Sequence, residues 1–130
     1  MKKILGLLLA LCLIAGCTSA FAAGIPVEQV KIGYITIGDE NEGYSANHLN
    51  GLKEAQAALG ISDDQVLCKY NVPETEDAYE AAIDLAEQGC NIIFADSFGH
   101  EPYIIEAAKK YPNVQFCHST GTRAHTEGLA

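Results

Sequence analysis

The sequence predicts an open, doubly wound α/β fold with a parallel sheet. Short apolar segments rich in β-branched residues alternate with single segments whose apolar residues recur at helical spacing. Glycine or proline stands at most of the joints between them. Because right-handed crossover connections place helices against a parallel sheet, we expect both faces of that sheet to carry helices.

Four strands are expected in this sheet. The segments "VKIGYITI" and "CNIIFADSF" are nearly continuous in apolar character, which is typical of strands buried on both faces. "QVLCKYNV" is closed by Pro73, and "NVQFCHST" follows the helix breaker Pro112. The predicted strands span residues 30–37, 65–72, 90–98 and 113–120.

Three helices are expected between the strands. Ser45 is placed to cap the first helix, and Gly60 supplies a left-handed stop at its end. Thr75 opens the second helix, whose alanine and leucine residues form one apolar stripe. Pro102 suits the first turn of the third, and two lysines suit its last turn. After Thr120 the alternation fails, so the unit is expected to be cut short within a longer protein.

The first residues have the layout of an export signal. Lys2 and Lys3 precede an apolar run over residues 4–15, which is short for a permanent membrane anchor. The string "IAGC" resembles a bacterial lipobox ending at Cys17, the residue that would be lipidated. Cleavage after Ala22, in "AFA", is the alternative and would release a soluble periplasmic or secreted protein. We therefore predict a signal peptide over residues 1–23, an α/β lobe over residues 24–130, and location outside the cytoplasm.

The acidic balance of the chain restricts its partners. The 130 residues include 17 Asp and Glu against 8 Lys and Arg, which gives a net charge of −9. All the acids follow Cys17, whereas two lysines precede it, so the mature part carries 6 − 17 = −11. Such a chain repels nucleic acid and anionic lipid, and neither is expected as a partner.

Ligands of open α/β sheets bind beyond the carboxyl ends of the strands. This rule selects four segments, namely residues 38–44, 71–74, 96–100 and 118–121. In the first, Asp39 offers a carboxylate to ligand hydroxyls and Tyr44 offers a ring that can stack on a flat ligand. In the third, Asp96, Ser97 and the amides after Phe98 are expected to face the same crevice at a helix entrance. The alternatives are an ordinary solvated turn at Tyr44 and a helix cap at Ser97 or Asp96, and Glu40 and Glu42 are expected to be solvated.

Several chemistries lack their sequence signatures. "IGDENEG" matches neither a dinucleotide nor a nucleoside triphosphate loop, and no G-x-S-x-G elbow is present. The histidines lack the spacing of a helical zinc pair and the cysteines lack C-x-x-C spacing, so no metal and no cofactor are expected. Cys68, Cys90 and Cys117 are expected to be small buried thiols, with one disulfide left open as an alternative.

The lipobox, "VKIGYITIGDENEGYSANHLNGLKEA", "YEAAIDLAEQGCNIIFADSFGHEPYIIEAAKKYPNVQF" and "HSTGT" together resemble the basic membrane protein family. These are substrate-binding lipoproteins of ABC importers, related to purine nucleoside receptors. The resemblance covers nearly all the mature chain but only the first part of a family member. Relatives often carry "S-F-N-Q" where this chain has "GYSA" over residues 43–46.

The resemblance implies a two-lobed, non-enzymatic protein that binds its ligand between the lobes and docks on a permease. It implies that Asp39, Tyr44 and the turn Ser97–Phe98–Gly99 face a nucleoside-like ligand, with Tyr44 at the position of a base-stacking phenylalanine. The second lobe and its residues are expected to be missing from this sequence. A secreted α/β enzyme and a sensory ligand-binding domain are the alternatives on the same scaffold.

Overall fold

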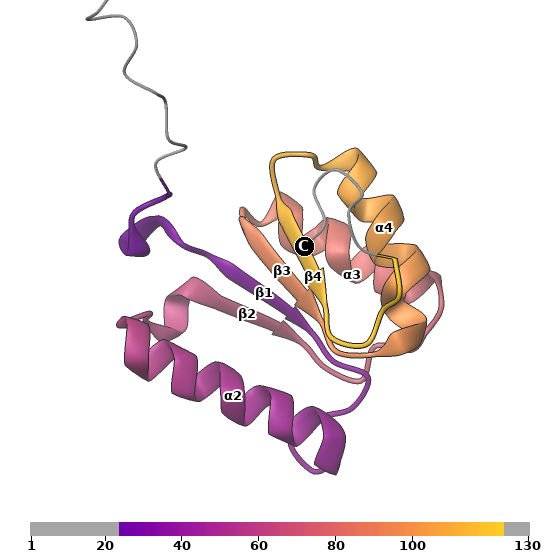
Figure 1. The fold of residues 1–130 in the computed structure, drawn as a ribbon, viewed down its shortest axis with the longest axis horizontal. Helices are drawn as coiled ribbons and strands as arrows, with labels where there is room; N and C mark the ends of the chain where they lie inside the picture. The colour runs from indigo at the N-terminus through magenta and orange to yellow at the C-terminus, as the bar shows by residue number, and fades with distance from the viewer. Residues whose placement is uncertain (1–23, 124–130) are drawn as a thin grey trace, which may run out of the picture.

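Residues 24–123 form a four-stranded parallel sheet with helices on both sides, as the computed structural model describes them (Figure 1). The strands lie in the order β2-β1-β3-β4. The open, doubly wound α/β fold is therefore confirmed. The strands are β1 Ile32–Ile35, β2 Val66–Lys69, β3 Ile92–Ala95 and β4 Gln115–His118, and the helices are α2 Gly43–Leu59, α3 Glu76–Glu87 and α4 Glu101–Lys110.

All four predicted strands exist, but each is shorter than its apolar segment. The apolar segments span eight or nine residues, and the paired strands have four each. Backbone pairing continues one residue past some strand ends, because the Thr36 N–H donates to Lys69 and the Asp96 N–H to Ile35. The remaining residues of each segment leave the sheet and form the loops at its carboxyl edge.

The predicted helix ends are correct except at one residue. Gly60 ends α2 with φ of 70°, and Thr75 caps α3 by accepting a hydrogen bond from the Asp77 N–H. Ser45, however, does not cap α2. Glu42 holds that position, because its two carboxylate oxygens accept from the backbone N–H groups of Tyr44 and Ser45. The short 3₁₀ turns η1 Val27–Gln29, η2 Asp63–Gln65 and η3 Phe98–His100 were not predicted.

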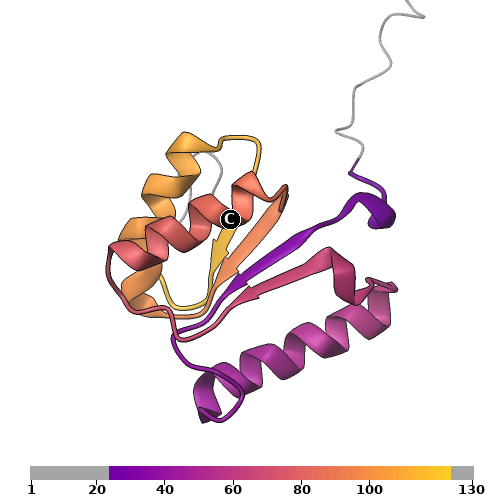
Figure 2. The ribbon, with the colours of Figure 1, turned by 180° about the vertical axis from the view of Figure 1, so that it is seen from behind.

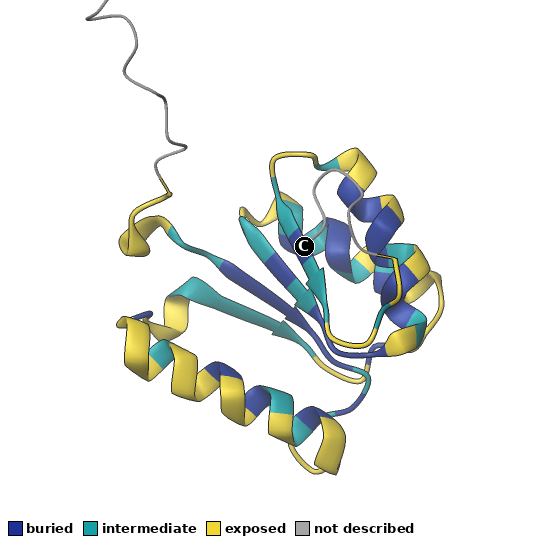
Figure 3. Ribbon diagram, in the orientation of Figure 1, coloured by how far each residue is buried: buried dark blue, intermediate teal, exposed yellow. Residues whose placement is uncertain are grey.

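The two faces of the sheet are covered unequally. Within residues 24–123, helices α3 and α4 lie together on one face and α2 is the helix on the other (Figures 1 and 2). The side of α3 and α4 holds a core cluster of fourteen buried residues, and the side of α2 holds one of four. Burial follows this difference, since α2 is exposed along most of its length while α3 and α4 bury continuous inner sides (Figure 3).

The predicted signal peptide, Cys17 and the cleavage site after Ala22 lie outside the described residues. None of the helices within residues 24–123 has the length and apolar character that crossing a membrane requires. The three cysteines of that part are free thiols; Cys90 is buried, and Cys68 and Cys117 are only partly buried.

Candidate functional site

The loops that follow the four strands are joined by hydrogen bonds at the carboxyl edge of the sheet. The loop after β1 meets the loop after β2 through Asn71, whose amide Nδ2 donates to Asp39 Oδ2 over 3.2 Å. It meets the loop after β3 through the Tyr44 hydroxyl, which donates to the Asp96 carbonyl over 2.6 Å. Ser119, after β4, donates its hydroxyl to the same carbonyl over 2.7 Å. We call this set of loops, residues 38–44, 71–74, 96–100 and 118–121, the carboxyl-edge loops.

Asp96 is the buried anchor of these loops. Its side chain has no exposed surface, and Oδ1 accepts from the Ile37 N–H over 2.9 Å. Oδ2 accepts from the Ser45 hydroxyl over 2.8 Å, and the same Ser45 oxygen accepts from the Gly38 N–H over 3.0 Å. Both carboxylate oxygens are therefore used inside the protein. The expectation that Asp96 faces the crevice is therefore wrong: it is buried, and with Ser45 it positions the loop after β1.

Tyr44 stands at the first turn of α2 with 41% of its surface exposed. Its hydroxyl is held by the Asp96 carbonyl, and its ring contacts His48 edge-on with centroids 4.8 Å apart. A ring fixed at one end and exposed along its side is suited to stack on a planar ligand. Tyr44 is thus both an exposed ring and a tie between the first and third loops.

Asp39 is a partly exposed carboxylate oriented by its neighbours. Oδ1 accepts from the Asn41 backbone N–H over 2.8 Å and from the Asn41 amide over 3.1 Å. The Asn41 N–H, followed by the Asn71 amide, holds the pKa of Asp39 below its ordinary value. Asn71 is the described non-glycine residue with a positive φ, 54°, which places its amide against Asp39. Asp39 is therefore charged at neutral pH and available to accept from a ligand hydroxyl.

The predicted turn Ser97–Phe98–Gly99 is occupied by a carboxylate from the loop after β2. Glu74 Oε1 accepts from the Ser97 hydroxyl and, over 2.8 Å, from the Gly99 N–H. These two donors lower the pKa of Glu74. The donors that sequence reasoning assigned to a ligand are therefore directed at Glu74. Phe98, beside them, is 59% exposed and adds another exposed ring to this edge.

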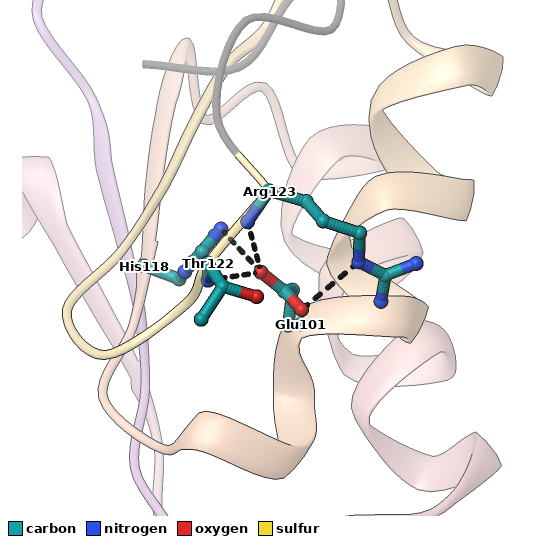
Figure 4. Close-up of polar contacts among 4 residues, drawn as sticks. All are labelled: Glu101, His118, Thr122 and Arg123. Carbon is teal, nitrogen blue, oxygen red and sulfur yellow. Dashed lines mark hydrogen bonds and ion pairs between the residues drawn. The ribbon is translucent and has the colours of Figure 1, made fainter.

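The loop after β4 is held by the buried carboxylate of Glu101 (Figure 4). Oε1 accepts from the backbone N–H groups of Thr122 and Arg123 over 2.5 and 2.6 Å, and Oε2 accepts from Arg123 Nε over 3.0 Å. The Arg123 N–H is the main cause that lowers the pKa of Glu101. His118 Nε2 lies 3.9 Å from Oε1. Glu101 thereby fixes the path of the chain just after β4.

The histidines do not form a metal centre in the part of the chain that the structure describes. Between residues 24 and 123, no three His, Cys, Asp or Glu side chains gather in a way that could hold an ion. His48 lies 3.3 Å from the Tyr34 hydroxyl, and the buried His100 places Nε2 2.9 Å from the Val72 carbonyl. These two contacts are structural. His125 lies outside the described residues.

Sequence reasoning missed the carboxylates that organise the loops. The sequence analysis expected Glu42 to be solvated, and it gave no role to Glu74 or Glu101. Glu42 stands two residues before Tyr44, at the position that a helix cap with an acidic side chain takes, and this signal was readable. Glu74 accepts from an N–H that lies 25 residues away in sequence, and Glu101 accepts from two that lie 21 and 22 residues away. The sequence holds no local signal for such contacts.

The strand order and the carboxyl-edge loops are those of a parallel α/β protein that is open at one edge of its sheet. Part of an ABC transporter solute-binding protein of Conexibacter woesei has the same α/β fold, because it superposes on 68% of the chain with a TM-score of 0.57. That structure is 20% identical and is covered over 28% of its length. A second solved structure, a transcriptional activator of the comK gene from Bacillus halodurans, covers 76% of the chain and 32% of its own, with a TM-score of 0.63 and 22% identity.

A particular relative is found by sequence. The chain is 36% identical over 95 residues to a purine-binding protein of Brucella abortus, a match over 72% of this chain and 27% of the relative. The chain thus spans about a quarter of the length of the curated relative it matches. The relative and the first structural neighbour are named for binding rather than for catalysis. No family model matches the chain.

Proposed function

We propose that the chain is the first lobe of an exported solute-binding protein of an ABC importer, of the basic membrane protein type, anchored by lipid at Cys17. The proposed ligand is a nucleoside or a similar planar, hydroxylated molecule. Asp39, Tyr44, Ser97, Phe98 and Gly99 are the proposed ligand-facing residues, and the Ser97 hydroxyl and the Gly99 N–H become available where a ligand displaces the Glu74 carboxylate. The purine-binding relative supports the ligand class, and the solute-binding neighbour supports the role.

One observation carries this proposal. The carboxyl-edge loops bring exposed rings and oriented carboxylates to one edge of the sheet: Tyr44 and Phe98 are 41% and 59% exposed, and Asp39 is held by amides. Rings stack on a flat base, and carboxylates accept hydrogen bonds from ribose hydroxyls. A single lobe leaves water on the other side of the ligand, so these interactions give weak binding by this chain alone.

The test is a titration of the ¹⁵N-labelled chain with adenosine, followed by NMR. We expect fast-exchange shifts confined to the carboxyl-edge loops, with a Kd in the millimolar range. Shifts confined to other surfaces would contradict the site, and micromolar affinity would contradict the role of a missing second lobe.

Two variants of Tyr44 separate its two contributions. Tyr44→Phe keeps the ring and removes the hydroxyl that donates to the Asp96 carbonyl. Tyr44→Ala removes both. If the ring stacks on the ligand, Tyr44→Phe keeps most of the affinity and Tyr44→Ala loses about tenfold, roughly 1.4 kcal/mol. Equal losses would assign Tyr44 to loop anchoring alone.

A further inference from the structure

The sheet face beside α2 carries an apolar groove that the proposed function does not use. Its volume is about 510 Å³. One wall is α2, and the floor is formed by Tyr34 of β1 and by Phe94 of β3. The groove is lined by Val27, Val30, Ile32, Tyr34, Asn47, His48, Gly51, Leu52, Ala55, Leu59, Ile61, Ile92 and Phe94, and we call this set the open groove.

In the described part of the chain, this face has one α-helix fewer than its opposite. A helix is about 10 Å wide and neighbouring strands lie about 4.8 Å apart, so one helix covers roughly two strands. Helices α3 and α4 together satisfy this ratio on one face (Figure 1). On the other face α2 packs through Leu52 with Ile32, Tyr34 and residues of β2. Phe94, in β3, and its register partner Cys117, in β4, are left partly exposed.

The wall that α2 presents is shaped for a second helix. Gly51 and Ala55 stand one turn apart on it, and a Cβ built at Gly51 meets no atom within 4 Å. Small residues at this spacing let another backbone approach closely. Leu59 is 62% exposed at one end of the wall. From His48 to Leu59 the wall is roughly 16 Å long, the length of about three helical turns.

A second copy of the chain fits this face poorly. Each copy carries a net charge of −9, so two copies repel each other. To cover the partner's sheet, α2 would also need an apolar outer side, and that side carries the exposed Asn50 and Glu54. A helix with lysines along its outer side is instead attracted by the acidic chain.

We infer that the open groove is the seat of one amphipathic helix of about three turns, apolar toward the sheet and basic toward solvent. That the rest of a two-lobed protein supplies this helix rests on the proposed function, since the chain spans only 27% of its purine-binding relative. The apolar lining of the open groove and the acidic charge of the chain do not depend on that function. The bound helix would lie beside α2 and cover the rest of this face of the sheet.

The test uses a fluorescein-labelled, 16-residue peptide of leucine, alanine and lysine with a single leucine stripe, and a scrambled peptide of the same composition. Fluorescence anisotropy follows its binding to the whole chain. We expect saturable binding of the striped peptide at least tenfold tighter than of the scrambled one. Leu59→Glu, in the groove wall, should weaken the striped peptide at least tenfold. Ala57→Glu, an exposed position on α2 outside the groove, makes the matched change and should alter affinity less than twofold.

Three results would overturn the inference. The first is equal affinity of the chain for the striped and the scrambled peptide, or equal affinity of Leu59→Glu and Ala57→Glu for the striped peptide. The second is a chain that sediments as a dimer and becomes a monomer on Leu59→Glu, which would assign the groove to a second copy. The third is peptide binding that appears only after residues 1–23 are removed, which would assign it to the leader. Adenosine binding is measured separately, so failure of the proposed function leaves each of these results readable.

Discussion

The two faces of the sheet differ at neighbouring residues of the same strands. Ile93 points toward α3 and α4 and is fully buried, whereas Phe94 points the other way and is only partly buried. In β4, Phe116 has no exposed surface, and Cys117 beside it is partly exposed. The side chains of one strand alternate between the faces, so this contrast isolates the effect of helix cover. The face under α3 and α4 is a fully packed core, which we call the finished face, and the face under α2 is only partly covered.

This difference separates what stabilises the chain from what it offers to partners. The face of α3 and α4 supplies most of the burial, and the carboxyl-edge loops, fixed by Asp96, extend from the strands that this face stabilises. The face of α2 contributes less to stability and remains accessible. Variants placed in pairs across the sheet therefore test the comparison directly.

The largest expected difference is between two phenylalanines. Phe116→Ala leaves a cavity in the core of the finished face and should lower the free energy of unfolding by about 3–5 kcal/mol. Phe94→Ala removes a partly exposed ring that stacks on Tyr34 with centroids 5.7 Å apart, and should cost about 1 kcal/mol. Urea unfolding followed by circular dichroism measures both. Equal losses would mean that the two faces contribute alike.

The buried carboxylate of Asp96 should matter next. Asp96→Asn replaces an acceptor by an amide that cannot accept from both the Ile37 N–H and the Ser45 hydroxyl. The free energy of unfolding should fall by about 1.5–3 kcal/mol in the same urea experiment. Asp39→Asn makes the matched change at a partly exposed carboxylate, and its effect should be smaller. A larger effect at Asp39 would contradict the anchoring role of Asp96.

Two glycines give effects of opposite sign. A Cβ at Gly33 would lie 3.0 Å from Ile93 Cγ1 and from Leu85 Cδ1, so Gly33→Ala overpacks the finished face and should cost about 1–3 kcal/mol. Gly51→Ala adds a methyl group to the exposed wall of α2, where no atom lies within 4 Å, and should stabilise by up to about 1 kcal/mol. Thermal unfolding of both variants tests the signs. Destabilisation by Gly51→Ala would show that the groove has no room.

The smallest expected effect is on the pH dependence of stability. Donors from Arg123 hold the pKa of Glu101 below its ordinary value. A carboxylate whose pKa is lower in the folded state contributes stability above its unfolded pKa, and this is lost as pH falls through the folded pKa. Between about pH 5 and pH 2, Glu101→Gln should therefore lose less stability than the unchanged protein. If the free energy of unfolding falls equally with pH in the two proteins, this role of Glu101 is contradicted.

The sequence predicted the order of elements because each is signalled locally. Apolar segments, the left-handed stop at Gly60 and the cap at Thr75 are decided within a few residues, and all are present in the structure. The cap of α2 was assigned wrongly because Ser45 and Glu42 are both able to cap. Asp96, 51 residues away, recruits the Ser45 hydroxyl into the core.

The candidate site was predicted only in outline. That strand exits meet at one edge follows from parallel topology, so the four loops could be selected from the sequence. Contacts such as Glu74 with Ser97, or Glu101 with Arg123, join residues of separate elements and depend on the final packing. The unequal cover of the faces was not predicted either, since crossover handedness assigns each helix a face but does not fix how many strands it covers.

The most direct test of the unequal faces is the rate at which native cysteines react with a maleimide. Cys90 is 1% exposed within the cluster packed by α3 and α4, and Cys117 lies partly exposed beside Phe94. Burial raises the pKa of both thiols, so the comparison rests on access. Mass spectrometry of peptides from the labelled chain should find Cys117 modified at least tenfold faster than Cys90. Equal rates, or faster modification of Cys90, would contradict the account.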